Sequence, residues 1–158
     1  MNDRPRPPFN RRELLLTGAA SVIALSLPLR VLARPTLDDA VRAFTDGAVA
    51  REGRVQLTIS PLVENGNAVP VSVDVDSPMA ADNHVRRIAL FNEKNPQADV
   101  AVFHLGPRAG RAHVATRIRL AGSQTVVALA ELSDGSFWLS RANVIVTIAA
   151  CIEDLSKA

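Results

Sequence analysis

Hydrophobic residues alternate with polar ones over most of the chain after Val55, and this period of two constrains the fold more than any other feature. Side chains of a β-strand point to opposite faces in turn, so the alternation predicts strands with one buried face. In residues 69–75, four valines alternate with Pro70, Ser72 and Asp74. The predicted strands are 55–59, 69–75, 88–91, 100–105, 112–120, 125–131, 137–140 and 144–148.

Turn-forming residues separate these strands, as at Asn65-Gly66, Asn95-Pro96 and Asp134-Gly135. Seven or eight short strands at this spacing predict an all-β fold, an antiparallel β-sandwich. Pro70 has no N–H to donate to a ladder. Its strand is therefore expected at the edge of a sheet, or with the proline nitrogen facing outward.

A short helix is predicted before the first strand. Thr36 can cap this helix, and Asp39, three residues later, completes a capping box. Leu37, Val41, Phe44 and Ala48 recur at helical spacing and would share one face. The domain is therefore expected to span residues 34–148, with one N-terminal helix before the sandwich.

Residues 1–33 have the layout of a twin-arginine export signal. Asn10-Arg11-Arg12-Glu13 precedes a moderately hydrophobic run, residues 14–29, and Val31-Leu32-Ala33 suits cleavage after Ala33. The run is 16 residues long, whereas a membrane-spanning helix needs about 20. The pattern predicts a protein of the periplasm with no stable membrane anchor.

The positive charge of the sequence belongs largely to this signal. The whole chain has a net charge of +2, but residues 34–158 contain 13 basic and 14 acidic residues, a net charge of −1. The chain also has five Phe, one Trp and no Tyr, which is little surface for stacking on bases. No nucleic-acid partner is expected, because neither the charge nor the aromatic content suits one.

Residues 34–158 contain no Cys-x-x-Cys, no His-x-His and no Gly-x-Gly-x-x-Gly motif, so no cofactor and no metal are expected. A single cysteine excludes an internal disulfide. The twin-arginine route exports proteins that have already folded, often with a cofactor or a partner. We therefore expect a partner subunit that folds onto this chain before export.

Two groups of charged residues invite a functional interpretation. His113, Arg117 and Arg119 form a basic stripe on one face of a strand, which could meet an anion or be a solvated or partner-covered face. Asp74 and Asp76 project from the same side of their strand, about 6–7 Å apart. That separation suits acid–base chemistry, but it also suits two solvated acids.

The histidines do not predict a metal site. His104 is expected on the face of Val100 and Val102, near the core, and His84 in a turn at residues 82–84. No spacing among His84, His104 and His113 matches a set of metal ligands.

Cys151 stands out because of its position, three residues after the last predicted strand and seven before the end of the sequence. A thiol on a terminal segment can extend from the domain into the pocket of another protein. Glu153 and Asp154 disfavour a negative thiolate beside them. An enzyme that receives this arm would then have to activate the thiol. The alternative is that Cys151 is a small apolar residue that continues the core.

Several segments together resemble the SoxY family, which supplies the sulfur-carrying subunit of periplasmic thiosulfate oxidation. They are the twin-arginine signal, the helix, Asn65-Gly66 before Val69-Pro70-Val71, Asp76-Ser77-Pro78-Met79, Asn95-Pro96, and residues 115–120, 128–135 and 146–148. The resemblance implies an immunoglobulin-like sandwich and a heterodimer with a SoxZ-like subunit. It also implies that SoxAX-like and SoxB-like enzymes load and process a sulfur group held on the cysteine.

In that family the cysteine lies in a Gly-Gly-Cys-Gly-Gly terminus, which Cys151 matches. The flanking residues differ, because this chain has Ala149 and Ala150 before the cysteine and Ile152 and Glu153 after it. The arm is similar to that of SoxY-related paralogues with Ala-Ala-Cys-Ile-Glu. Alanine and β-branched isoleucine stiffen and widen a segment that glycines keep thin. The carried group, the accepting enzymes or both can therefore differ from those of thiosulfate oxidation.

Three hypotheses follow. In the first, Cys151 covalently carries a sulfur substrate between separate enzymes, so the chain itself is not an enzyme. In the second, the chain is a non-catalytic interaction module, and its cysteine is structural or forms an intermolecular disulfide. In the third and weakest, it is a hydrolase that uses Asp74 and Asp76.

Overall fold

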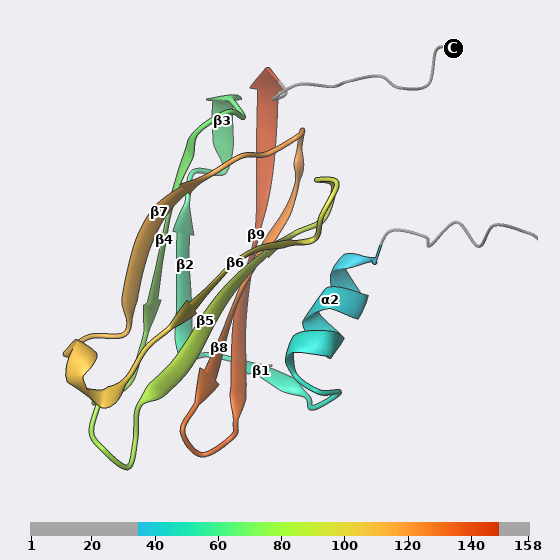
Figure 1. The fold of residues 1–158 in the computed structure, drawn as a ribbon. Helices are drawn as coiled ribbons and strands as arrows, with labels where there is room; N and C mark the ends of the chain where they lie inside the picture. The colour runs from blue at the N-terminus through green and yellow to red at the C-terminus, as the bar shows by residue number, and fades with distance from the viewer. Residues whose placement is uncertain (1–34, 149–158) are drawn as a thin grey trace, which may run out of the picture. The chain divides into compact units, whose positions relative to one another are not determined.

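The structure, a computed structural model, describes residues 35–148, which contain one α-helix and nine strands (Figure 1). The predicted export signal and the residues around Cys151 lie outside this range. The elements are α2 (Leu37–Phe44), β1 (Ala50–Glu52), β2 (Val55–Ile59), β3 (Leu62–Asn65), β4 (Val69–Val75), β5 (Val85–Asn92), β6 (Asp99–His104), the 3-10 turn η1 (Pro107–Ala109), β7 (His113–Ile118), β8 (Gln124–Leu132) and β9 (Phe137–Ile148).

The strands form two sheets, which confirms the predicted β-sandwich. The larger sheet has the order β1-β9-β8-β5-β6, with β3 also paired to β9, and the smaller has the order β2-β4-β7. Most neighbours are antiparallel as expected, but β1 and β3 both run parallel to β9. They pair with opposite ends of that long strand, β1 at Phe137 and β3 at Ile145.

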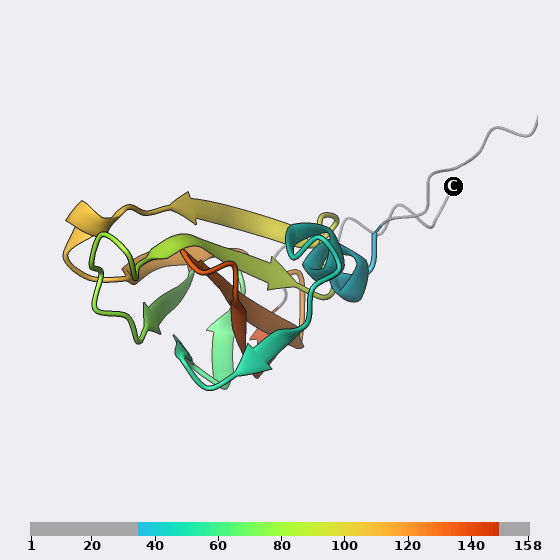
Figure 2. The ribbon, with the colours of Figure 1, turned by 90° about the horizontal axis from the view of Figure 1, so that it is seen from below.

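The core lies between the sheets and follows the predicted alternation. In β4, all four valines are buried while Pro70 faces outward. β5 and β8 are buried on both faces along most of their length, because α2 covers the outer face of the larger sheet. The helix lies against β5 in both views (Figures 1 and 2).

The helix confirms the predicted capping box. The Thr36 hydroxyl accepts a hydrogen bond from the Asp39 N–H, and the Asp39 carboxylate accepts one from the Thr36 N–H, each at 3.1 Å. Phe44 packs edge-on against the rings of Phe91 and Phe137. The placement of Ala48 on the same face is wrong, because the helix ends at Phe44 and Ala48 is exposed.

The described residues form nine strands instead of the seven or eight predicted, for two reasons. Residues 137–140 and 144–148 belong to one strand, because Arg141, Ala142 and Asn143 stay paired with β8 even though they interrupt the hydrophobic pattern. β1 and β3 are short, and only their pairing with β9 makes them strands.

Pro70 lies in β4, the central strand of the smaller sheet, so the edge position is wrong. The hydrogen bonds agree with the other alternative, in which the proline nitrogen faces away from a paired strand. Asp76 N donates to Arg54 O beside β2, whereas Val75 N donates to Ala112 O beside β7. Successive backbone nitrogens of a strand face its two neighbours in turn, so the nitrogen of Pro70, six residues before Asp76, also faces β2. The pairing between β2 and β4 has already ended at Ile59 there. No ladder hydrogen bond is lost there.

Candidate functional site

The candidate site is the end of β9, from which the chain continues to Cys151. Cys151 and its neighbours Ala149, Ala150, Ile152 and Glu153 lie outside the described residues. The last residue of β9 is Ile148, and three residues of any chain span at most about 10 Å. Cys151 is therefore tied within about that distance to a strand whose surroundings are known.

Paired strands hold β9 up to its last residue, β8 on one side and then β3 on the other. On one side it pairs with β8 as far as Val144, opposite Gln124. On the other, β3 pairs with it in parallel from Ile145 to Ile148. The Thr147 hydroxyl also donates to the Glu64 carbonyl oxygen at 3.1 Å. The exit direction of the chain is thus set by a paired strand and not by a loose loop.

Ser123 extends the hydrogen bonding of β9 beyond the end of β8. Its hydroxyl accepts a hydrogen bond from Val146 N at 3.0 Å and donates to Val146 O at 3.4 Å. The serine thus takes the place of the strand residue that would otherwise pair with Val146. Nothing in the sequence marks Ser123 for this task, since the contact joins residues 23 positions apart.

Asn95 joins the loops at this end of the sandwich. Its side-chain oxygen accepts hydrogen bonds from Ala121 N and from the Gln124 side chain, both at 2.9 Å. Its side-chain nitrogen donates to Arg119 O at 2.7 Å. The Gln124 side-chain oxygen in turn accepts from Lys94 N at 2.7 Å. The loop before β6 and the loop before β8 are therefore locked together beside β9.

A carboxylate also lies at this end. Glu93 accepts a hydrogen bond from Thr125 N at 3.1 Å. This bond and a side-chain bond from the same threonine lower the pKa of Glu93. Glu93 therefore remains ionised at neutral pH, next to the β8–β9 pair.

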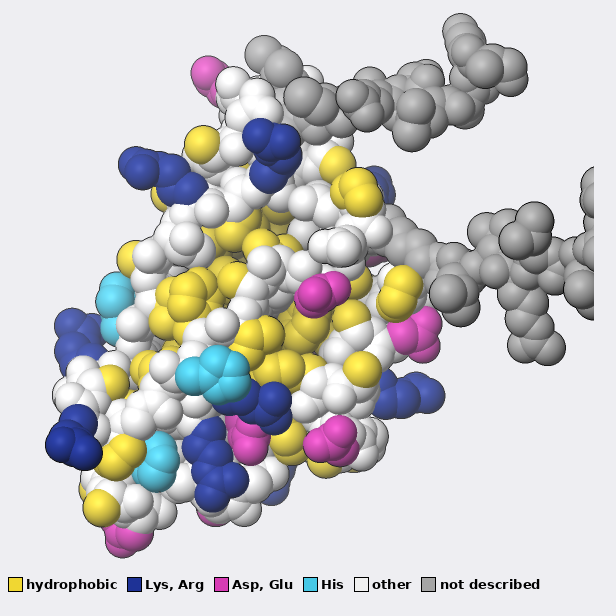
Figure 3. Space-filling model, viewed as in Figure 1, with side chains coloured by type: hydrophobic (Ala, Val, Ile, Leu, Met, Phe, Trp, Pro, Cys, Tyr) yellow, Lys and Arg dark blue, Asp and Glu magenta, His cyan; other side chains and the backbone are white. Residues whose placement is uncertain are grey.

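The histidines occupy separate settings. The ring of His84 lies 3.1 Å from the Ala80 carbonyl oxygen, and Figure 3 shows the visible histidine side chains separated by other residues. The expectation that His104 lies near the core is wrong, because it is exposed. A bulge between Leu90 and Phe91 changes the phase of β6, so Val100 contacts the core but Val102 and His104 face outward. Within residues 35–148, no cluster of metal-ligating side chains occurs.

Asp74 pairs with His113 instead of acting with Asp76. The His113 ring nitrogen Nδ1 lies 2.8 Å from the Asp74 carboxylate, and Arg111 contacts the same oxygen at 3.2 Å. Asp76 follows the end of β4 and is exposed. The register between β4 and β7 creates the Asp74–His113 pair, so no sequence pattern could have shown it.

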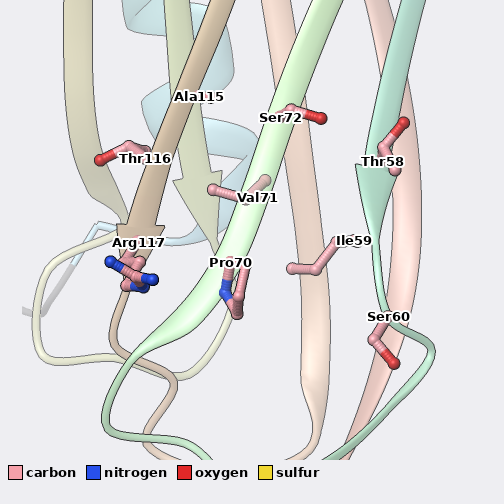
Figure 4. Close-up of a pocket in the computed structure, with 9 residues that line it drawn as sticks. All are labelled: Thr58, Ile59, Ser60, Pro70, Val71, Ser72, Ala115, Thr116 and Arg117. Atoms are coloured by element: carbon pink, nitrogen blue, oxygen red, sulfur yellow. The ribbon is translucent and has the colours of Figure 1, made fainter.

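The predicted basic stripe is exposed, with His113 and Arg117 on the outer face of β7 and Arg119 just after it. Arg117 borders a shallow pocket on the outer face of the smaller sheet (Figure 4). Arg117 is the one charged residue among those that line this pocket, which are Thr58, Ile59, Ser60, Pro70, Val71, Ser72, Ala115, Thr116 and Arg117.

No helix within residues 35–148 has the length and apolar character to cross a membrane.

Curated protein sequences gave no match to this chain. A family model described as sulfur oxidation protein SoxY matches residues 41–151. The solved structure of the sulfur carrier protein SoxY from Chlorobium limicola f thiosulfatophilum is 28% identical, with a TM-score of 0.60, and the match covers 70% of this chain and 91% of that one.

Superoxide reductases share the fold at lower identity. The enzyme called neelaredoxin from Ignicoccus hospitalis is 19% identical, with a TM-score of 0.53 and coverage of 60% of this chain and 80% of its own. A putative superoxide reductase from Thermotoga maritima is 20% identical, with a TM-score of 0.52 and coverage of 65% and 89%. At these identities the likeness shows the sandwich alone. Since the SoxY model matches residues 41–151, well over half of this chain, the chain belongs to the SoxY family of sulfur oxidation proteins.

Proposed function

We propose that this protein is a covalent carrier in periplasmic sulfur oxidation, and that the thiol of Cys151 holds the sulfur substrate. The observation that carries the proposal is that the SoxY match runs from residue 41 to residue 151, so it ends at the only cysteine of the chain. The similar structure from Chlorobium is itself that of a sulfur carrier protein. The anchored end of β9 supports the same role, because it fixes where the arm leaves the domain.

Loading consists of forming one sulfur–sulfur bond. The Cys151 thiol loses its proton, its sulfur bonds to the terminal sulfur of the incoming anion, and two electrons leave. A haem-containing, SoxAX-like enzyme is the proposed acceptor of these electrons. A SoxB-like hydrolase then removes sulfate with water, and one sulfur atom remains on the cysteine. The carrier contributes attachment and presentation, while the separate enzymes perform the chemistry.

The proposal includes a SoxZ-like partner subunit and export through the twin-arginine signal in residues 1–33. Its substrate is a sulfur-containing anion, but Ile152 and Glu153 distinguish the arm from a glycine-rich one. A tunnel shaped for glycines would not accept the branched side chain of Ile152, and the carboxylate of Glu153 repels a second anion. We therefore expect loading enzymes adapted to this arm.

The test is the intact mass of the protein purified from its own periplasm, measured before and after a thiol reductant. We expect a fraction with added mass on Cys151 that the reductant removes, and a mature N-terminus after Ala33. Cys151→Ser should carry no such mass, although the protein should still fold and be exported.

A native protein with no reducible adduct under any sulfur-oxidising growth condition would contradict the carrier role. So would sulfur oxidation that continues unchanged in a strain carrying Cys151→Ser. That second result would favour a non-catalytic interaction module instead. Ser133→Ala is a suitable control strain. Within residues 35–148, the Ser133 hydroxyl bonds only to residues 82 and 84, in a turn outside the β3, β8 and β9 segments that hold the arm.

A further inference from the structure

The two sides of the sandwich differ in how they are closed. On one side, β2 packs against β8 and β9 of the larger sheet. On the other, β6 ends the larger sheet and β7 ends the smaller one, and neither pairs with the other. We call this second side, formed by β6, η1 and β7, the open side. Its two strands leave one row of backbone N–H and C=O groups each without a ladder partner among the described strands.

Hydrophobic side chains reach the surface at the open side. Val100, Phe103, Leu105 and Val114 contact the core but remain partly exposed. Val102 lies on the outer face of β6, and 43% of it is exposed. Figure 3 shows hydrophobic side chains gathered between β7 and β6 and continuing across β6 toward α2. A contiguous apolar surface of this kind is typical of a protein–protein interface.

The charge around this surface has one dominant sign. From residue 99 to residue 119, the chain carries four arginines and two histidines but one acidic residue, Asp99. Arg111 is paired with Asp74, whereas Arg108, Arg117 and Arg119 form no ion pair with any other residue of the described range. Arginine is enriched at interfaces, where its charge selects a partner of opposite charge.

We infer that the open side is the docking surface of the partner subunit, and that the partner meets it with apolar side chains bordered by acidic ones. The inference rests on the proposed function, since it locates the partner that the proposed carrier requires. The partner would cover the apolar surface between β6 and β7, while its carboxylates pair with the free arginines. The exit of β9 stays uncovered, because β9 lies on the other side of β8 and β5 from β6.

The test is the affinity between the full chain and the purified SoxZ-like subunit of the same genome, measured by calorimetry at two salt concentrations. Val102→Glu should weaken binding at least about tenfold, because it places a charge among apolar contacts. Arg117→Glu with Arg119→Glu should weaken it by a similar factor, and more at low salt. Val49→Glu is the matched control, because Val49 is 84% exposed and lies outside the open side, and it should change affinity less than about twofold.

Hydrogen exchange of the complex gives an independent readout, since amides of residues 99–118 should gain protection on binding. The inference would be overturned by unchanged affinity in both Val102→Glu and the arginine variant, or by protection confined to β2, β3 and β9. The adduct on Cys151 would remain a separate test of the carrier role. A wild-type chain that does not bind the SoxZ-like subunit would overturn the inference too. So would a wild-type chain that dimerises alone through Val102, because the occupant would then be a second copy.

Discussion

Replacing Ser123 with alanine tests whether the arm depends on the anchored end of β9. The substitution removes the hydroxyl that bonds to both Val146 N and Val146 O. The bond to the N–H, at 3.0 Å, carries most of the effect, because the second, at 3.4 Å, is long. Losing one good hydrogen bond and leaving a partly buried N–H without its partner costs about 1–2 kcal/mol. β3 still pairs with this segment, so the damage should stay local.

Amide hydrogen exchange measures this effect directly. A loss of about 1–2 kcal/mol should raise the exchange rate of the Val146 amide roughly 5- to 30-fold. Amides in the centre of β8 should change little. Ser133→Ala is the matched control, since the Ser133 hydroxyl likewise accepts from a backbone N–H, that of His84, and donates to a carbonyl, that of Asp82. It should leave the exchange of Val146 unchanged.

The loading of Cys151 in the same two variants links the anchor to function. If a firm exit presents the arm to its enzymes, Ser123→Ala should lower the adduct-bearing fraction and Ser133→Ala should not. Exchange of Val146 that is unchanged in Ser123→Ala would refute the assignment of Ser123 as an extension of β8. Faster exchange of the Val146 amide with an unchanged adduct-bearing fraction would show that the Ser123 hydrogen bonds have no part in presenting Cys151 to its enzymes.

Two further predictions concern the helix. Thr36→Ala should destabilise the protein by about 1 kcal/mol through loss of the capping box, measured by urea denaturation. The side-chain hydrogen bond from Thr36 lowers the pKa of Asp39. The part of the stabilisation that comes from this bond is complete above the ordinary carboxylate pKa and is lost as the pH falls through the lowered value, whereas the bond from the Asp39 N–H to the Thr36 hydroxyl does not titrate. A loss of stability in Thr36→Ala that is the same in the ionised and protonated states would contradict this. Phe44→Ala should cost about 2–3 kcal/mol, less than a fully buried phenylalanine, because it removes the edge contacts with Phe91 and Phe137. A change below about 0.5 kcal/mol would mean that α2 adds little to the sheet it covers.

Local patterns in the sequence were sufficient for the elements that depend on neighbouring residues. The capping box of Thr36 and Asp39 is confirmed, as is the alternation of the valines in β4. Apart from Ala48, which lies beyond the end of the helix, the errors occur where a distant strand decides the outcome. β1 and β3 exist as strands because β9 pairs with them, and His104 is exposed because a bulge against β5 shifts the phase of β6. Neither the partner strand nor the bulge leaves a mark in the local pattern.

The sequence by itself determined that this protein is a β-sandwich with one capped helix and a single cysteine near its end, because side-chain periodicity, capping and cysteine count are local properties. The tertiary structure alone decided what surrounds the end of β9, which side of the sandwich is open, and which charges are paired. Ser123 meets Val146, and Asp74 meets His113, across 23 and 39 residues of chain. Such contacts depend on strand order and register, and these are set only when the two sheets pack together.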